Sequence, residues 1–479
     1  MLKKRHDIDE ILHPKSLAIY GVSPKGGLGN LLMQGLIELG FPKIYPIHPR
    51  ESEIVGIKAY PDLRSIDDQI DLIIVAVHPK NVKKIIQDAV EKNVKGAVLF
   101  TAGFREIGEE GRKLEDQVVD IAKKSGLRII GPNCMGIYCP ESKLSFFPSL
   151  PSEKGKISFI SQSGSLSTLI CLNSMLKGIL FSKIISVGNC ADLGINDFLE
   201  YLGSDDDTKI IGFYLEGLNK GKEFVELAKK ISKVKPIIIW KVGKTKSGIK
   251  AAQSHTGSLC GDFKMWDKIL DQAGIIRVNN IDQLVEHFGR FDQTFGQNPI
   301  LPKGNKVAII SGPGGPAVSC ADACELAGLE LADLSNETEQ NIRKIIPKFG
   351  TSVKNPIDLG LQVSFLPQLE NNVIELVGSD ENVDMVMVYL SILKKDQVKG
   401  LIKIQDKIKK PIALVTAFDI NTSTKQMGFQ NYFLPLKPKY VPKYLRKMYE
   451  KGISAHINEQ NAAKALYNLF KYTEFLKKS

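Results

Sequence analysis

The sequence predicts an α/β protein with three tandem modules, each built on a largely parallel sheet. Short runs rich in β-branched residues alternate with helical stretches, which is typical of βαβ units. A strand that leads into a glycine-rich turn and then into a helix occurs three times, at 17–40, 157–172 and 307–328. This recurrence indicates three separate sheets rather than one large sheet.

Two connections rich in proline and polar residues, around 146–156 and 291–305, separate these units. The length of 479 residues also suits about three domains. We therefore expect domains over 1–146, 147–295 and 303–479.

The composition is that of a globular protein, with 43% hydrophobic and 24% charged residues. The formal net charge is +11, but the basic residues are spread along the chain. Because no compact basic tract is interleaved with aromatic residues, nucleic-acid binding is disfavoured. An anionic substrate, an acidic partner or simply a solvated lysine-rich surface explains the excess of positive charge.

The seven cysteines are odd in number and form no CxxC pair, which disfavours a disulfide framework or a zinc site. This usage fits a reducing cytoplasm. The first residues lack the apolar region of a signal peptide, and no run approaches about 18 apolar residues. We therefore expect a cytoplasmic protein without a membrane span.

The first module is expected to hold strands at 17–22, 44–47, 71–77, 96–100 and 127–130. The first strand enters GVSPKGGLGN, where glycines let a ligand approach the backbone and the next helix offers N–H groups to an anion. Ser23 replaces the second glycine of GxGxxG, and Arg50 rather than an acid follows the second strand, which disfavours a nicotinamide dehydrogenase. We interpret the turn as a phosphate cradle, with a turn that binds nothing as the alternative.

The first module ends with the turn Gly131–Gly136, GPNCMG, after its last strand. At the carboxyl end of a parallel sheet such a turn lies where ligands bind. A plain loop with a buried Cys134 is the alternative.

The second module is expected to hold strands at 157–160, 184–187, 210–215, 237–241 and 275–278. Its first strand enters SQSG, a helix start whose hydroxyl and amide donors suit phosphate. Strand 210–215 ends at Glu216, an acid placed to reach the same edge unless it is a solvated loop residue. The later KVGKT fails the P-loop pattern because Ile238 occupies the first glycine position.

One histidine, His255, stands among small polar residues in AAQSHTGSLCG at 251–261. The segment is too small and too polar to form a core, and it predicts a loop that presents the imidazole. We interpret His255 as a nucleophile that carries a phosphoryl group. From this stretch alone, an exposed histidine in an ordinary loop is the simpler alternative.

The third module is expected to hold strands at 307–310, 385–390 and 412–416. Its first turn, SGPGGP, again leads into a helix, and Pro316 is tolerated in a first helical turn. Cys320 and Cys324 lie four residues apart on one helix face and are expected to be buried. The last ~35 residues are expected to form one or two lysine-rich amphipathic helices.

Several signatures follow one another in fixed order: GVSPKGGLGN, FISQSG with SVGNCADLG, YLEG with SHTGSLCG, and finally SGPGGP with NPIDLG. Together they closely resemble the NDP-forming acyl-CoA synthetase family, the relatives of succinyl-CoA synthetase. The number of modules resembles that of the α subunit of ADP-forming acetyl-CoA synthetases. The resemblance implies a Rossmann-like CoA-binding domain followed by two flavodoxin-like ligase domains.

The resemblance also implies roles for individual residues. The residues expected to bind coenzyme A are Gly21, Val22, Ser23, Gly29, Arg50, Thr101 and Ala102. The thioester and acyl group would lie near Asn133 and Cys134. Phosphate would bind at Ser161, Gln162, Ser163 and Gly164. His255 would be phosphorylated and Glu216 would hydrogen-bond to it, and no metal site is expected in this chain.

The implied reaction interconverts acyl-CoA, phosphate and ADP with carboxylic acid, CoA and ATP, through an acyl phosphate and a phosphohistidine. ADP or ATP with Mg²⁺ would bind to a separate ATP-grasp β subunit, in an α2β2 heterotetramer. A catalytically silent CoA-binding regulatory protein of the same fold is the alternative. The sequence does not identify the acid, the preferred nucleotide or the role of the third glycine turn.

Overall fold

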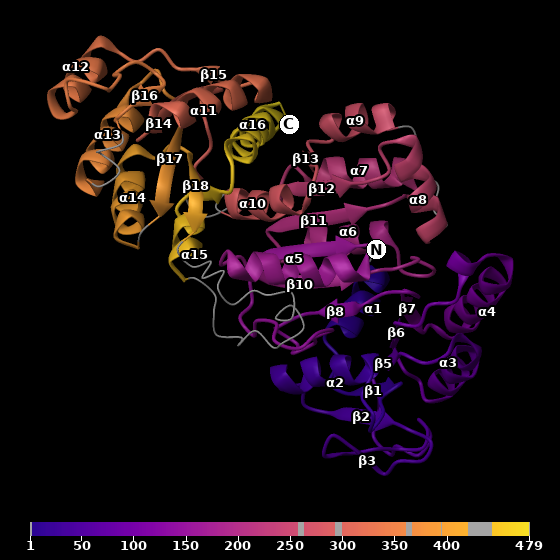
Figure 1. The fold of residues 1–479 in the computed structure, drawn as a ribbon. Helices are drawn as coiled ribbons and strands as arrows, with labels where there is room; N and C mark the ends of the chain where they lie inside the picture. The colour runs from indigo at the N-terminus through magenta and orange to yellow at the C-terminus, as the bar shows by residue number, and fades with distance from the viewer. Residues whose placement is uncertain are drawn as a thin grey trace. The chain divides into compact units, whose positions relative to one another are not determined.

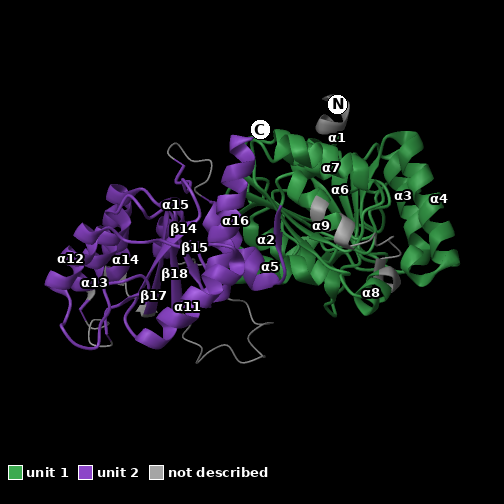
Figure 2. Cartoon of the chain, turned by 90° about the horizontal axis from the view of Figure 1, so that it is seen from above, with its two compact units in different colours: residues 1–175, 180–275, 435–440 green, residues 176–179, 276–434, 441–479 purple. Residues whose placement is uncertain are grey.

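The computed structural model describes residues 2–256, 263–292, 299–360, 366–393, 395–419 and 443–478. The chain forms two compact units, shown by colour in Figure 2. Unit 1 comprises residues 1–175 and 180–275, whereas unit 2 takes 176–179 and most of the chain from 276 onward. The expected domain limits near 146 and 295 remain predictions.

The first sheet of unit 1 has five parallel strands in the order β2-β1-β5-β6-β7 (Figure 1). These strands are β1 (Leu17–Tyr20), β2 (Ile44–Ile47), β5 (Leu72–Val75), β6 (Gly96–Leu99) and β7 (Arg128–Ile130). The accompanying helices are α1 (Leu2–Leu12), α2 (Leu28–Leu39), α3 (Val82–Glu91) and α4 (Glu109–Ser125), with 3₁₀ turns η1 (Pro79–Asn81) and η2 (Arg105–Ile107) and the hairpin β3 (Glu53–Ile54) and β4 (Ile57–Lys58). All residues of β1, β5 and β6 are buried, because helices cover both faces of a parallel sheet.

The second sheet runs in the order β12-β11-β9-β10-β8 within unit 1. Its strands are β8 (Gly136–Tyr138), β9 (Ile157–Ser161), β10 (Phe181–Ser186), β11 (Ile210–Leu215) and β12 (Ile237–Lys241). Its helices are α5 (Gly164–Leu176), α6 (Ile195–Ser204), α7 (Gly221–Ile231), α8 (Lys246–Thr256) and α9 (Phe263–Gln272). Only β8 is antiparallel, and it enters this sheet directly from the turn that ends the first sheet.

Unit 2 contains a parallel sheet in the order β15-β14-β17-β18-β19, and β16 also pairs with β14. The strands of this sheet are β14 (Lys306–Ser311), β15 (Glu330–Leu331), β16 (Ile357–Asp358), β17 (Met385–Leu393), β18 (Ile412–Asp419) and β19 (Ile453–His456). Unit 2 also contains β13 (Ile276–Val278), which does not belong to this sheet. Its helices are α10 (Ile281–Phe291), α11 (Gly314–Ala327), α12 (Asn336–Ile345), α13 (Pro367–Ser379), α14 (Lys395–Ile408), α15 (Lys443–Glu450) and α16 (Glu459–Lys477). Cys320 and Cys324 on α11 are fully buried, as expected.

The strand order explains where the three glycine turns lie. In each sheet the first parallel strand (β1, β9 or β14) has the next parallel strand of the chain on one side and a later strand on its other side. At such a topological switch point the two crossing helices diverge and leave a crevice at the carboxyl end of the strand. The turns that follow β1, β9 and β14 therefore all open into such crevices.

The predicted α/β class and parallel sheets are confirmed. Every strand predicted for the three modules is present, three of them with the predicted ends and the others with ends shifted by one to three residues. The strands β3, β4, β8, β15, β16 and β19 were not predicted, because each has only two to four residues. The expected loop at 251–261 is wrong in its first half, since 251–256 form the last turns of α8, and 257–261 lie outside the described residues. Among the described helices, none combines the length and apolar composition needed to cross a bilayer.

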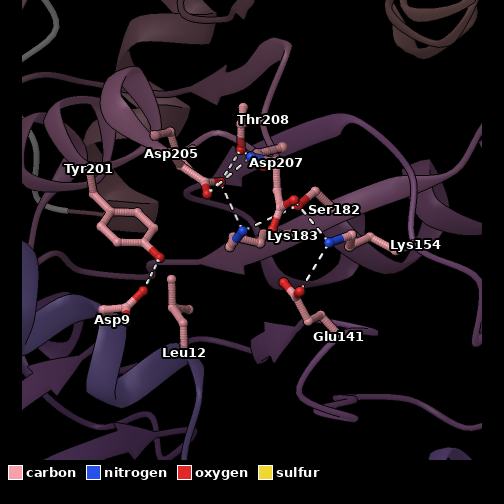
Figure 3. Close-up of polar contacts among 12 residues, drawn as sticks. Asp9, Leu12, Glu141, Lys154, Ser182, Lys183, Tyr201, Asp205, Asp207 and Thr208 are labelled. Atoms are coloured by element: carbon pink, nitrogen blue, oxygen red, sulfur yellow. Dashed lines mark hydrogen bonds and ion pairs between the residues drawn. The ribbon is translucent and has the colours of Figure 1, made fainter.

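A polar network stabilises unit 1 at the amino end of the second sheet (Figure 3). Lys183 on β10 is 1% exposed and its ammonium lies 2.8 Å from the Asp205 carboxylate. Burial raises the pKa of Asp205, but the hydrogen bonds from Lys183 and Thr208 outweigh it and the pKa is lowered. On α1, Asp9 accepts a hydrogen bond of 2.8 Å from the Tyr201 hydroxyl. These charges stabilise the fold at the edge opposite the glycine turns.

Unit 2 contains a charge network centred on Glu286 of α10, in which Glu286 and His456 are fully buried and the Lys177 side chain is 23% exposed. Its carboxylate accepts hydrogen bonds from Lys177 at 2.8 Å and from the His456 Nδ1 at 3.1 Å. Burial raises the pKa of Glu286, but the hydrogen bond from His456 and the charge of Lys177 outweigh it and lower the pKa to about 2. Burial lowers the pKa of His456, so this imidazole is neutral and Lys177 supplies the compensating charge.

Glu286→Gln removes the negative charge from this network and is expected to destabilise unit 2 by about 3 kcal/mol. Amides of α10 should then exchange faster in hydrogen-exchange mass spectrometry of the whole chain. Because the pKa of Glu286 is lowered on folding, its contribution is present above pH 4.5 and is lost as the pH falls toward about 2. The free energy of unfolding of the variant should therefore lack this part of its dependence on pH.

Glu375→Gln is the matched control, since Glu375 makes an exposed ion pair with Lys407. Its effect should stay below about 0.5 kcal/mol. Equal protection of α10 in Glu286→Gln and in the unmodified chain would contradict the predicted contribution.

Candidate active site

The turn after β1 is shaped by two glycines that no other residue can replace without a clash. Gly21 has a φ of +94°, and a Cβ there would lie 2.1 Å from the Ala76 carbonyl oxygen. A Cβ on Gly29 would lie 2.3 Å from the carbonyl oxygen of Gly21. The first turn of α2 therefore packs directly on the end of β1, as a nucleotide-binding βα turn requires.

In the same turn, hydrogen bonds fix the backbone at Ser23, whereas the tip of the turn is accessible. The Asn30 side chain accepts a hydrogen bond from the Ser23 N–H at 3.0 Å and donates one to the Ser23 carbonyl at 2.9 Å. A Cβ on Gly26 or Gly27 would meet no atom within 4 Å. The tip and the following start of α2 are thus accessible to a ligand with phosphate groups.

The remaining residues predicted to contact coenzyme A differ in how available they are. Arg50 and Ala102 are exposed. The Thr101 hydroxyl is buried and links two strand ends, because it accepts from the Val77 N–H at 3.2 Å and lies 2.8 Å from the Val77 carbonyl oxygen. Thr101 therefore shapes the turn, while Arg50 and Ala102 are free to meet a ligand.

The turn Gly131–Gly136 presents Asn133 in the left-handed region, with φ of +57°. The Asn133 N–H donates to the Thr101 carbonyl at 3.0 Å, so this amide is not available to a substrate. The Cys134 thiol lies 3.4 Å from the Leu99 carbonyl oxygen, and burial raises its pKa to about 12. A protonated and buried thiol packs inside the module rather than acting as a nucleophile.

A second loop, residues 187–191, interlocks with this turn. The Asn189 N–H donates to the Pro132 carbonyl at 2.9 Å, and a Cβ on Gly188 would lie 2.1 Å from the same oxygen. Gly188 has a φ of +51°. Only glycine allows the two loops to approach this closely.

The Asn189 side chain is fixed by carboxylates and directed toward Asn133. Its Nδ2 donates to Glu106 at 2.7 Å and to Glu115 at 3.0 Å, which leaves its Oδ1 facing the Asn133 Nδ2 at 3.5 Å. Burial raises the pKa of Glu106, but the hydrogen bonds from Asn189 and from backbone N–H groups outweigh it and lower the pKa. No role for Asn189 was predicted from the sequence, although this residue lies within the SVGNCADLG signature.

A cavity of about 150 Å³ opens beside this loop, at the carboxyl edge of the second sheet. Residues from the three adjacent segments line it, including Gln162 after β9, Asn189 and Cys190 in the loop, and Gly217 after β11. Further lining residues are Asp192, Gly194, Ile195, Asn196, Asp197, Leu218, Asn219, Lys220 and Glu223.

The predicted phosphate segment borders this cavity at the start of α5. The Ser161 hydroxyl donates to the Ser163 carbonyl at 2.7 Å and accepts from the Ser163 N–H at 3.1 Å. The Ser161 hydroxyl is therefore used to shape the turn. The first N–H groups of α5, from Gly164 onward, have no partner within the helix and can bind an anion.

Glu216 lies directly after β11 and is 5% exposed, so it is not a solvated loop residue. Its backbone N–H donates to the Gln162 Oε1 at 2.6 Å. Burial, together with the charge of Glu216 and a hydrogen bond to it, raises the pKa of Tyr214. The structure thus brings together the predicted Glu216 and the predicted phosphate segment.

The His255 backbone belongs to the last turn of α8 rather than to a loop. Its side chain lies outside the described residues. Its proximity to Glu216 therefore remains a prediction.

Three family models match the chain: a CoA binding domain over 15–140, a succinyl-CoA ligase like flavodoxin domain over 154–289, and a ligase-CoA domain over 307–392. The chain is also 38% identical over 435 residues to the α subunit of ADP-forming acetate–CoA ligase II from Pyrococcus furiosus, covering 88% of this chain and 93% of that protein. The chain belongs to the NDP-forming acyl-CoA synthetase family. The predicted family and the predicted Rossmann-like and flavodoxin-like fold class are thereby confirmed.

Other members of the family differ in length. ADP-forming acetate–CoA ligase from Methanocaldococcus jannaschii is 37% identical over 479 residues, which cover 99% of this chain but 64% of that protein. A dinucleotide-forming acetyl-coenzyme A synthetase 1 from Ca. Korarchaeum cryptofilum, solved with phosphate and ADP, superposes with a TM-score of 0.79. It is 27% identical and the match covers 98% of this chain and 97% of that chain.

Gly188→Ala is expected to separate the two interlocked loops. The new Cβ meets the Pro132 carbonyl and its residue must adopt a positive φ, which together should destabilise unit 1 by about 2–4 kcal/mol. Urea denaturation followed by the fluorescence of Trp240 on β12 measures this change. Gly221→Ala is the control, since its Cβ would meet Trp266 only at 3.7 Å, and equal stabilities of the two variants would contradict the proposed packing.

Proposed function

We propose that this chain is the α subunit of an ADP-forming acyl-CoA synthetase that interconverts acyl-CoA, phosphate and ADP with carboxylic acid, CoA and ATP. One observation carries the proposal. A single cavity at the start of α5 lies beside two segments: the loop that packs on Asn133, and the turn that contains Glu216. Acyl transfer to phosphate and phosphoryl transfer to a histidine need such adjacent sites.

Coenzyme A is proposed to bind at the first switch point, where the open tip at Gly26 and Gly27 precedes α2. The residues assigned to it are Gly21, Val22, Ser23, Gly29, Arg50, Thr101 and Ala102. The close approach of Gly21 and Gly29 supports a diphosphate against the backbone, and exposed Arg50 supports a further phosphate contact.

The first step is the attack of phosphate on the thioester carbonyl near Asn133, which releases CoA thiolate and forms an acyl phosphate. Because the Asn133 N–H is bonded to Thr101, stabilisation of the oxyanion falls to the Asn133 side-chain amide. The Asn189 Oδ1 orients that amide. The phosphate is proposed to bind at Ser161–Gly164, against the N–H groups of α5.

In the second step the imidazole of His255 attacks phosphorus, and the carboxylic acid leaves as its anion. Glu216 is proposed to accept a hydrogen bond from the other ring nitrogen, which fixes the tautomer and increases the nucleophilicity of the imidazole. The phosphoryl group then passes to ADP.

ADP or ATP with Mg²⁺ is proposed to bind to an ATP-grasp β subunit in an α2β2 heterotetramer. Two of the similar proteins support a partner, because one is named as an α subunit and another, whose name mentions no subunit, is longer than this chain. We infer a cytoplasmic location from the free thiols of all six described cysteines. A silent CoA-binding regulatory protein is less well supported, since it needs neither the buried Glu216 nor the cavity.

His255→Ala is expected to abolish phosphoryl labelling of the chain. The full chain, co-expressed with the ATP-grasp subunit, is mixed with acetyl-CoA and radioactive phosphate. The unmodified chain should acquire an acid-labile, alkali-stable label, because phosphohistidine has this stability. Full labelling of His255→Ala would refute the proposal, and the same assay with a panel of acyl-CoA esters identifies the acid.

Glu216→Gln is expected to slow the labelling of His255 by about 100-fold, because the neutral amide cannot stabilise the positive charge that develops on the imidazole as a carboxylate does. Rapid-quench measurement of the label gives the rate. Glu226→Gln on the exposed face of α7 is the matched control and should label at the normal rate. A normal rate for Glu216→Gln would remove Glu216 from the mechanism.

A further inference from the structure

The peptide groups around Glu216 are held by side chains on both sides. The Gln162 Oε1 accepts from the Glu216 N–H at 2.6 Å and from the Gly217 N–H at 3.1 Å. The Lys241 ammonium donates to the Glu216 carbonyl at 2.8 Å. Gln162 and Lys241 are 5% and 6% exposed, so water does not compete for these bonds.

This arrangement follows from the strand register. β11 lies between β9 and β12, with Tyr214 opposite Ser161 and Leu215 opposite Lys241. The backbone ladder ends there, and the next N–H groups of β11 have no strand partner. Gln162 and Lys241 extend the ladder with their side chains, and each buried N–H left without a partner would cost about 1–3 kcal/mol.

The two accepted bonds also fix the orientation of the Gln162 amide. Because Oε1 faces the Glu216 turn, Nε2 faces the other way, and Gln162 lines the cavity together with Cys190. Cys190 follows Asn189, whose side chain contacts Asn133. One buried amide therefore connects the turn of Glu216 to the loop beside Asn133.

We propose that Gln162, together with Lys241, is a positioning residue that holds the Glu216 backbone, and through it the Glu216 carboxylate, beside the cavity that Gly217 lines, instead of a residue whose side chain binds phosphate. This inference rests on the proposed function. The segment Ser161–Gly164 then has two roles. The N–H groups at the start of the helix bind the anion, and the Gln162 side chain positions Glu216.

The test measures the rate of phosphohistidine formation against phosphate concentration, in the full chain with its ATP-grasp subunit and acetyl-CoA. Gln162→Met keeps the side-chain volume but cannot accept the two N–H bonds. Its rate at saturating phosphate should fall by about 10- to 100-fold, because small displacements of catalytic groups have effects of this size. The phosphate concentration at half-saturation should change by less than about twofold, as expected when binding is unaffected.

The opposite pattern would overturn the proposal. If Gln162→Met raises the half-saturating phosphate concentration and recovers the normal rate at high phosphate, the side chain binds phosphate. Unchanged kinetics would overturn it too. Absence of label in the unmodified chain would refute the proposed function itself, so the two failures are distinguishable.

Gln162→Glu keeps an acceptor for both N–H groups. This second variant tests the proposal even if Gln162→Met does not fold. Its rate at saturating phosphate should exceed that of Gln162→Met, although repulsion from the added charge raises the phosphate requirement. A saturating rate as low as that of Gln162→Met would contradict positioning through these bonds. Gln405→Met is the control, because Gln405 is a buried amide in unit 2 that donates to the Lys410 carbonyl at 2.9 Å.

Discussion

The reversal of strand order at the first parallel strand of each sheet is the constraint on which the rest of this structure depends. It forces successive crossover helices to opposite faces and leaves the carboxyl end of β1, β9 and β14 uncovered. Glycines follow each of these strands because the chain must turn sharply there without filling the crevice. The site in unit 1 is built on two such crevices, one for the predicted coenzyme and one for the predicted phosphate.

The polar groups of the second sheet are divided between its two edges. At the amino edge, Lys183 and Asp205 compensate each other, and their network is complete. At the carboxyl edge, Gln162 and Asn189 are buried and hydrogen-bonded and line a cavity, and the buried Glu216 directly precedes Gly217 of the same lining. Buried polar groups beside a cavity are ordered before a ligand arrives, which reduces the reorganisation that a reaction requires.

The sequence allowed the strands, the glycine turns and the place of Glu216 at the carboxyl end of a buried strand to be predicted, because these depend on local pattern and on the ends of strands. Two kinds of feature were not predictable. The contacts of Asn189 with Glu106 and Asn133 join segments more than fifty residues apart. The helical state of 251–256 was missed because alanine and glutamine favour helix more strongly than the neighbouring small polar residues favour a loop.

The interlocking of Gly188 with the Pro132 carbonyl has a consequence for the choice of acid. The wall beside Asn133 is made by two loops that follow strands of different sheets and share main-chain hydrogen bonds. Neither loop can be lengthened or given a larger residue at its contact unless the other moves as well. Substrate range in this chain should therefore evolve through compensating pairs of changes, and single replacements that enlarge the pocket should be rare.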